Sequence, residues 1–260
     1  STPTRDVALA DPITYMKLNN EAVQTRNSME SGPYSRSKID NTISGRDPIA
    51  YPVTDWKNIL FKSHTMNQRA NMNVGGGGKV ARYYFAATFN QDNGILKVDH
   101  LNNFNNNIKL KTYGLRANVD VNITKTTEAG VKLYGTFDDY NGPIGGGAQL
   151  YNKAIKSDPV SFPPYFPTDS AHIFVHHTLF GNTSPQLINP YADMVKGYQQ
   201  YNQNLMLAQF NLKQDLSFIT KGLNLQALFN TTRYSYFNVS RSYRTYFYNS
   251  IIYDRVNSKY

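Results

Sequence analysis

The sequence contains no cysteine, so disulfide bonds and thiolate metal sites are excluded. It also lacks any apolar run near the roughly 18 residues that a membrane-spanning helix needs, and its mean hydropathy is −0.53. These absences exclude a helical membrane protein but leave a transmembrane β-barrel open, because barrel strands alternate polar and apolar residues. The first five residues, STPTR, lack a signal-peptide pattern. We expect either a cytosolic chain or an interior piece of a longer precursor.

Acidic residues are few compared with basic ones, 18 against 27, and the net charge is +9. The basic residues are scattered singly, without a basic run or a recognition-helix pattern, so we expect no nucleic-acid partner. Basic side chains in a barrel lumen and in loops near anionic lipid explain the same charge. The 20 tyrosines favour a surface with one apolar face, one wet face and amphipathic rings where the two meet.

A period of two dominates the centre of the chain and predicts strands. Residues 113–123 alternate without interruption, which matches the 9–11 residues that a tilted strand needs to cross a bilayer. The four glycines at 75–78 predict a tight turn with positive φ. Further alternation predicts strands at 69–74, 82–90, 131–138, 206–213, 223–230 and 234–253, with turns at 124–128 and 220–222.

Helices are expected only in the connections. Asp11 followed by Pro12 predicts the start of a helix, and Asp55 predicts a cap for a second short helix at 56–61. A third is expected at 149–156, whereas residues 33–52 are expected to form a loop.

Short and long connections between the predicted strands alternate along the chain. The short ones fall at 75–78, 124–128 and 220–222, and the long ones at 91–107 and 140–198. Outer-membrane barrels have this layout, with short periplasmic turns and long outer loops. We therefore predict an all-β fold: a segment of an antiparallel transmembrane β-barrel with short helices in its loops. The alternative is a soluble or surface-attached β-sandwich that binds glycans.

Five short elements, in order, resemble the SusC/RagA family of TonB-dependent outer-membrane transporters of Bacteroidetes. YPVTDW at residues 51–56 is similar to the family's YPNTDW, with Val53 in place of Asn. NPYA at 189–192 followed by GY at 197–198 resembles a stretch that precedes a strand. Three others are NMNVGG at 71–76, RYYF at 82–85 and NQDNGI at 90–95; residues 11–22 also resemble the helix that follows the plug domain.

The resemblance implies an importer of oligosaccharides or peptides in the cell outer membrane. It implies a SusD-like surface lipoprotein as partner, and TonB acting through a plug and TonB box that we do not find in these residues. Residues 1–260 would be the N-terminal part of a 22-strand barrel, with residues 11–62 and 140–198 as extracellular loops. An arc of seven or eight strands has two unpaired edges that lipid does not tolerate, so the intact protein is expected to supply the rest.

Nothing in the sequence indicates an enzyme, and we expect no cofactor. The spacing of His172 and His176 would suit two metal ligands on a helix, but the stretch is β-branched and aromatic, and solvated loop histidines are the favoured interpretation. Asp138 and Asp139 are adjacent in a strand, so their carboxylates point to opposite faces and do not form a catalytic pair.

Two groups of residues are candidates for contact with substrate. Aromatic rings bind the apolar faces of sugars, and packing within the loop or against the partner lipoprotein is the alternative role for the loop rings. The loop aromatics are Tyr151, Phe162, Tyr165 and Phe166. The predicted lumen-facing residues are Arg116, Asn118, Asp120, Lys132, Tyr134, Gln209 and Asn211, with Lys213, Asn224 and Gln226 beyond them.

Overall fold

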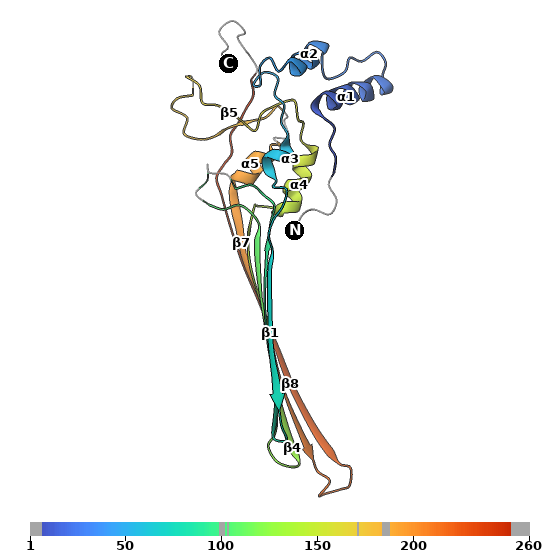
Figure 1. Ribbon diagram of the computed structural model, residues 1–260, viewed down its shortest axis with the longest axis vertical. Coiled ribbons are helices and arrows are strands. Elements are labelled where there is room, and N and C mark those ends of the chain that lie inside the picture. The colour runs from blue at the N-terminus through green and yellow to red at the C-terminus, as the bar shows by residue number, and fades with distance from the viewer. Residues whose placement is uncertain (1–6, 99–101, 103, 171, 184–187, 251–260) are drawn as a thin grey trace.

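The computed structural model describes residues 7–98, 102, 104–170, 172–183 and 188–250. Its main feature is a six-stranded antiparallel sheet in the order β1-β2-β3-β4-β7-β8, so the chain is mostly β as predicted. The sheet is long and twisted and carries a helical cap at one end (Figure 1). The strands are β1 (Gln68–Gly77), β2 (Ala81–Asn93), β3 (Lys109–Asn122), β4 (Thr127–Gly142), β7 (Gly197–Asp215) and β8 (Asn224–Ser242).

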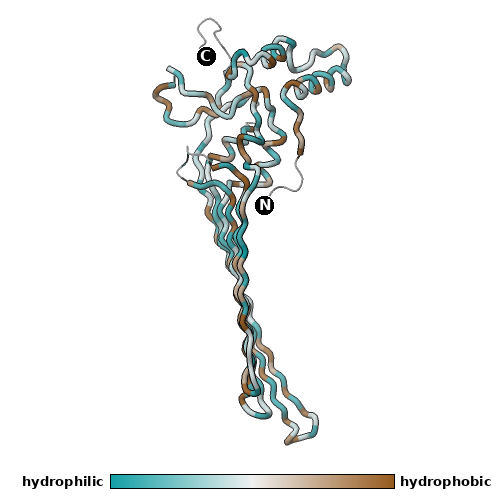
Figure 2. The backbone as a smooth tube through the Cα atoms, viewed as in Figure 1, coloured by the Kyte–Doolittle hydropathy of each residue, from teal (hydrophilic) through white to brown (hydrophobic). Residues whose placement is uncertain are grey.

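The register gives the sheet two chemically different faces, because residues directly opposite each other on paired strands share a face. Leu115 lies opposite Ala87 and Gly135, and Gly135 lies opposite Met206. Along each strand, hydrophobic and hydrophilic residues alternate (Figure 2). The alternation in the sequence therefore becomes an apolar face and a polar face that extend across all six strands.

The short turns all lie at the end of the sheet that is farthest from the cap (Figure 1). They connect β1 to β2, β3 to β4 and β7 to β8, and Gly222 adopts φ +84° in the last of them. The glycine run differs from the prediction, because Gly75, Gly76 and Gly77 continue β1 opposite Tyr84, Tyr83 and Arg82. A Cβ on Gly76 would lie 2.7 Å from the Tyr83 hydroxyl, so the missing side chain makes room for that ring.

The cap is built from both long segments that the sequence assigned to separate loops. Five helices belong to it in the part of the chain that the structure describes. The predicted N-caps Asp11 and Asp55 accept hydrogen bonds from Ile13 N and Asn58 N. In the described part of the chain, none of the helices has the length and apolar character that crossing a membrane requires. The helices are α1 (Pro12–Arg26), α2 (Arg36–Ser44), α3 (Trp56–Leu60), α4 (Gly146–Lys156) and α5 (Pro190–Val195).

Helix α2 corrects the expectation of a loop at 33–52. The Ser35 hydroxyl accepts a hydrogen bond from Lys38 N at 3.2 Å, and Gly45 ends the helix in the left-handed conformation at φ +60°. A serine N-cap and a glycine after the last turn are the usual helix boundaries. Both signals are present in the sequence, but the polar composition between them conceals the helix.

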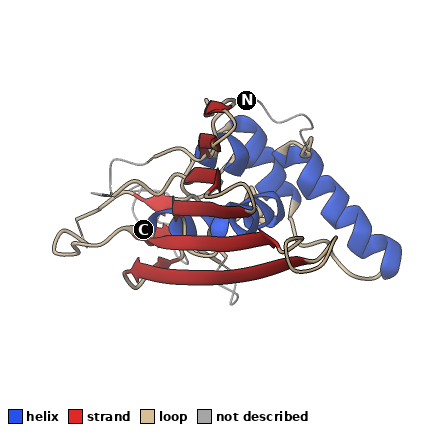
Figure 3. Cartoon of the chain, turned by 90° about the horizontal axis from the view of Figure 1, so that it is seen from below, coloured by secondary structure: helices blue, strands red, loops and turns tan. Residues whose placement is uncertain are grey.

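Among the described residues the main sheet has six strands rather than the seven or eight expected, because the predicted strands at 223–230 and 234–253 form the single strand β8. The other extended segments are short and pair elsewhere. β5 (Tyr165–Phe166), β6 (Leu179–Gly181) and β9 (Phe247–Tyr248) form a separate three-stranded sheet in the cap. The predicted strand at 234–253 is continuous with β8 only as far as Ser242, and residues 251–253 lie outside the described residues. Figure 3, viewed from the turn end, shows the long strands side by side with the helices beyond them.

Candidate functional site

The apolar face of the sheet is exposed rather than packed. Leu115 is 54% exposed, Leu133 48% and Phe229 65%. On β3 the apolar side chains run from Tyr113 to Val121 before Lys111 ends them on the cap side. Those nine residues match the length of strand that crosses a bilayer at a tilt. Monomeric soluble proteins rarely expose a continuous apolar surface of this extent.

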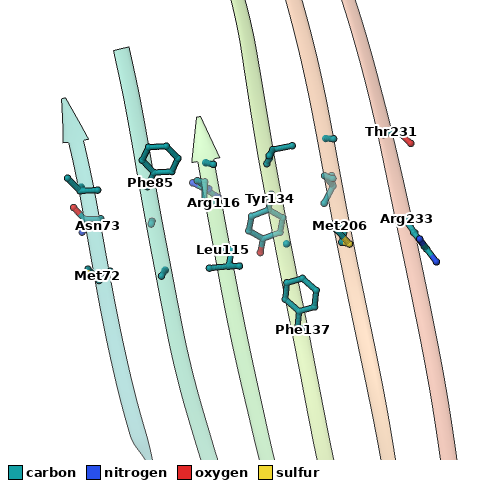
Figure 4. A pocket seen from close by; sticks show the side chains of 18 residues that line it. Met72, Asn73, Phe85, Leu115, Arg116, Tyr134, Phe137, Met206, Thr231 and Arg233 are labelled. Atoms are coloured by element: carbon teal, nitrogen blue, oxygen red, sulfur yellow. The ribbon is translucent and has the colours of Figure 1, made fainter. Parts of the chain in front are cut away.

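A hollow of about 690 Å³ lies on this face, at mid-height of the sheet. Its lining includes Met72, Phe85, Leu115 and Met206, which come from four different strands (Figure 4). Arg233 on β8 also lines it, opposite Met206 in the register. Asn73, Arg116 and Tyr134, which belong to the polar register of their strands, and Thr231 are also among the lining residues. Arg233 is the arginine of the lining that belongs to the apolar register.

The polar face carries all seven predicted lumen-facing residues. Arg116 lies opposite Tyr134, Asn118 opposite Lys132, and Lys132 opposite Gln209. The remaining two residues, Asp120 and Asn211, lie on either side of Gly130. A Cβ on Gly130 would lie 2.5 Å from Asp120 Oδ1 and 2.4 Å from Asn211 Oδ1. The prediction that these residues share one face is confirmed. That this face lines a lumen stays a prediction.

Charges on the polar face form a small network near the turn end. Glu128 lies 3.7 Å from Arg82 and 4.0 Å from Lys213. The Arg116 guanidinium lies 5.5 Å from the centre of the Tyr134 ring. Ion pairs as exposed as these contribute roughly 0–1 kcal/mol each, so the network matters more as a wet, charged surface than for stability.

A row of tyrosines lies on the polar face close to the cap, and the sequence did not predict it. Tyr140 and Tyr201 stack with ring centres 4.6 Å apart, and Tyr236 follows at 5.7 Å from Tyr201. Nearby, Asp138 Oδ1 is buried without a hydrogen-bond partner among the described residues. The signal was their position, since each falls in the polar register of its own strand, but finding the row requires knowing which strands pair.

The four loop aromatics divide into different roles. Phe162 is only 4% exposed and packs against Trp56 with ring centres 5.5 Å apart, so it takes the packing role. Tyr151 is half-buried against Phe61 at 5.6 Å. Tyr165 is 45% exposed, 5.4 Å from Tyr191, and Phe166 is half-buried beside it. Tyr165 is therefore the most open of the four rings.

The two most recognisable motifs meet in the core of the cap. Trp56 from YPVTDW and Tyr191 from NPYA belong to one buried cluster, together with residues of α3, α4 and α5. The fully buried Asn189 amide donates to the carbonyls of Pro164 and Gly181, both at 2.8 Å. Its oxygen accepts from Ala192 N at 3.0 Å and so caps α5. Both motifs position the cap rather than an exposed site.

A second polar junction joins α1 and α2 to the rest of the cap. The Tyr34 hydroxyl donates to Asp158 Oδ2 at 2.8 Å. Burial and the neighbouring Asp158 carboxylate raise the pKa of Tyr34 well above its ordinary value of 10.0. Burial lowers the pKa of Lys38, whose ammonium lies 5.3 Å from the centre of the Tyr34 ring. The junction is therefore held by a tyrosine that keeps its proton and donates it to the Asp158 carboxylate oxygen in a hydrogen bond.

The histidine-rich segment contacts other groups in the cap. His172 Nδ1 lies 2.6 Å from Asp169 Oδ1, and His177 Nε2 lies 2.7 Å from the Tyr248 hydroxyl. Across the described ranges, no three or more His, Cys, Asp or Glu side chains are grouped so as to hold a metal ion. His100 lies outside those ranges.

Asp138 and Asp139 do occupy opposite faces, as expected. Asp139 lies opposite Lys111 on the apolar side and accepts a hydrogen bond from Asn202, while Asp138 lies opposite Thr112 on the polar side.

Searches for relatives return neither a matching family model nor a matching curated protein.

Proposed function

We propose that this chain forms part of the wall and outer vestibule of an outer-membrane β-barrel that imports oligosaccharides or peptides. The observation that carries the proposal is the long antiparallel sheet with one exposed apolar face and one polar face. Lipid would cover the first face and water or substrate would contact the second. The sheet is open among the described residues, with β1 and β8 at its edges. The proposal assigns their partners to further strands of the same barrel.

The position of the cap supports an orientation. Short turns gather at one end of the sheet, and the helices and long connections gather at the other. In outer-membrane barrels the short turns face the periplasm, so in this proposal the cap lies outside the cell. The cap would then meet a SusD-like lipoprotein, as the resemblance implies, and TonB would act from the periplasmic side.

The polar face supports passage of a hydroxyl-rich substrate. It carries amides and charged groups at mid-height, including Asn118, Lys132 and Gln209, and the tyrosine row of Tyr140, Tyr201 and Tyr236 near the cap. Amides and charges hydrogen-bond hydroxyl groups, and tyrosine rings offer flat apolar surfaces with a polar tip.

A β-sandwich accounts for the structure less well. A sandwich covers the apolar face of one sheet with a second sheet about 10 Å away. The only other sheet in the described part of the chain is β5-β6-β9, whose strands have two or three residues each. It lies in the cap and leaves the apolar face uncovered.

Single-cysteine scanning tests the proposal, since the chain has no cysteine of its own. Nitroxide labels at Leu115→Cys and Leu133→Cys report the apolar face, and labels at Asn118→Cys and Gln209→Cys serve as matched controls on the polar face. In the full chain reconstituted into lipid vesicles, we expect collisions with oxygen to dominate at the first pair. Collisions with a water-soluble nickel complex should dominate at the second. Nickel access to all four sites would overturn the proposal.

A further inference from the structure

On β8 the apolar face is interrupted and then resumes nearer the cap with Phe237 and Val239. From Leu225 to Phe229, β8 contributes apolar side chains to this face, but the next positions toward the cap are Thr231, Arg233 and Ser235. The neighbouring strand β7 places Ala208, Met206 and Asn204 opposite them. The guanidinium thus replaces an apolar group in the same cross-strand row as Leu115.

Arg233 has no carboxylate within ion-pair distance among the described residues, although other charges lie on its face. Two rows nearer the cap, Lys111 lies opposite Asp139, which is already engaged by Asn202. Lys109 and Arg241 follow on the same face beyond that row. Four basic side chains and one acidic side chain therefore lie on this side of the sheet. Arg233 lies among the apolar rows, and the other three basic side chains lie beyond these rows toward the cap.

The hollow next to Arg233 offers an apolar binding surface in addition to the positive charge. It holds about 690 Å³ beside Met72, Leu115 and Met206, with Arg233 among its lining residues (Figure 4). A mostly apolar hollow beside the Arg233 guanidinium matches a molecule that has an acyl chain and an anionic head. A guanidinium forms two parallel hydrogen bonds to phosphate oxygens, and it is desolvated more readily than an ammonium group.

We infer that Arg233 and the adjoining hollow bind the phosphorylated lipid A part of a lipopolysaccharide, with an acyl chain in the hollow and a phosphate on the guanidinium. The inference rests on the proposed function, which places the cap outside the cell. The cap-side half of the apolar face then faces the outer leaflet, where lipopolysaccharide is the phosphate-bearing lipid. Lys111 and Arg241 extend the positive surface toward the head group.

Binding by the purified full chain tests this inference. The chain is purified in a non-ionic detergent, and native mass spectrometry counts adducts with added lipid A, phosphatidylglycerol or phosphatidylcholine. We expect lipid A to bind at the lowest concentration. Arg233→Gln should weaken lipid A binding by about fivefold, the effect of one basic residue near an anionic surface. Arg233→Lys should bind lipid A with intermediate strength, because it keeps the charge but loses the two parallel hydrogen bonds to phosphate.

Arg82→Gln is the matched control, because Arg82 lies opposite Asp120 on the polar face of the sheet and does not line the hollow. It should leave lipid A binding unchanged. Equal lipid A binding by wild type and Arg233→Gln would overturn the inference, as would equal binding of phosphatidylcholine. Phosphatidylglycerol binding as tightly, with the same dependence on Arg233, would overturn the assignment to lipid A. A dimer that Arg233→Gln abolishes and lipid A does not affect would assign the hollow to a second copy of the chain.

Failure of the proposed function looks different. A chain that stays monodisperse without detergent would contradict the barrel wall itself, and the lipid site with it. A chain that carries a detergent belt but binds lipid A equally well without Arg233 would contradict the lipid site alone.

Discussion

The indole Nε1 of Trp56 donates a hydrogen bond of 3.0 Å to the backbone carbonyl of Asp158, a residue 102 positions later. Thr54 adds two more bonds to the same stretch, from its N to Pro159 O at 2.8 Å and from its hydroxyl to Phe162 O at 3.0 Å. The segment before β1 is thereby joined to the segment between β4 and β7. These two segments form one folded cap with its own core.

Phe162→Ala tests whether the cap depends on this core. Truncating a buried phenylalanine costs about 3–5 kcal/mol because it leaves a cavity. Trp56, the only tryptophan in the chain, packs against Phe162 and reports on the cap. We expect its emission to shift to the red at lower denaturant concentration in the variant.

Tyr165→Ala is the matched control, since Tyr165 lies in the same loop but is 45% exposed. Its cost should stay below about 1 kcal/mol, as for most exposed positions. If both variants unfold the cap at the wild-type denaturant concentration, Phe162 is not a core residue. If only Tyr165→Ala weakens substrate uptake while both proteins remain folded, Tyr165 keeps its candidacy as a substrate contact.

The strands were predictable because a half-buried strand shows its two faces directly in the sequence. Residues 113–123 alternate without a break, and β3 covers all but the last of them. The start of α1 was predictable for a similar reason, since Asp11 and Pro12 act on neighbouring residues. Such local rules fail where the deciding partner is distant in sequence, as in the Trp56–Asp158 contact.

In the candidate site, too, the residues set by local sequence were predictable and those set by distant pairing were not. The polar residues of β3 and β4 could be assigned to one face from alternation alone, because the two strands form a hairpin. The tyrosine row required the pairing of Tyr140 with Tyr201, which are separated by the whole of α4, β5, β6 and α5. Phe162 was proposed as a substrate contact because an aromatic, proline-rich loop shows nothing of the core that it fills.

Asn189 provides a second test of the cap. In Asn189→Ala two buried carbonyls, of Pro164 and Gly181, lose their donor, and Ala192 N loses its acceptor. Unpaired buried groups and a lost N-cap together should cost about 2–4 kcal/mol. The cap transition, followed by Trp56 emission, should move to a correspondingly lower denaturant concentration.

Asn58→Ala is the control, because Asn58 is exposed on α3 and its side chain forms no hydrogen bond with the described residues. It should change the cap stability by less than about 0.5 kcal/mol. A loss of equal size in the two variants would show that asparagine content, rather than the buried network of Asn189, determines the result.

The Tyr34–Asp158 junction predicts a pH dependence at the alkaline end. The pKa of Tyr34 is raised in the folded chain, so its contribution is fully present below the unfolded value near 10.0 and is lost as pH rises above it. At pH 8, Tyr34→Phe should destabilise the cap by about 1 kcal/mol, through the lost hydrogen bond. Above pH 10 the difference between the two proteins should shrink.

Denaturant unfolding, followed by Trp56 emission, measures that difference at about pH 8.0 and about pH 10.5, which lie on either side of the ordinary tyrosine pKa of about 10. The other tyrosines titrate alike in the two proteins and cancel in the comparison. A difference that stays constant across the two conditions would show that Tyr34 does not keep its proton through the contact with Asp158.

Gly197, where β7 leaves the cap, predicts a strict steric requirement. A Cβ at this position would lie 2.1 Å from the backbone oxygen of Arg241 and 2.8 Å from Ser242 Cα. Backbone cannot swing aside as a side chain can, so Gly197→Ala should push β8 away from β7 and cost about 1–3 kcal/mol or more.

Gly78→Ala is the matched control at the other end of the sheet, where an added Cβ meets nothing within 4 Å. Amide hydrogen exchange should accelerate at the cap end of β7 and β8 in the first variant and stay unchanged in the second. Equal protection in both would contradict the close approach of the two backbones at the point where the sheet joins the cap.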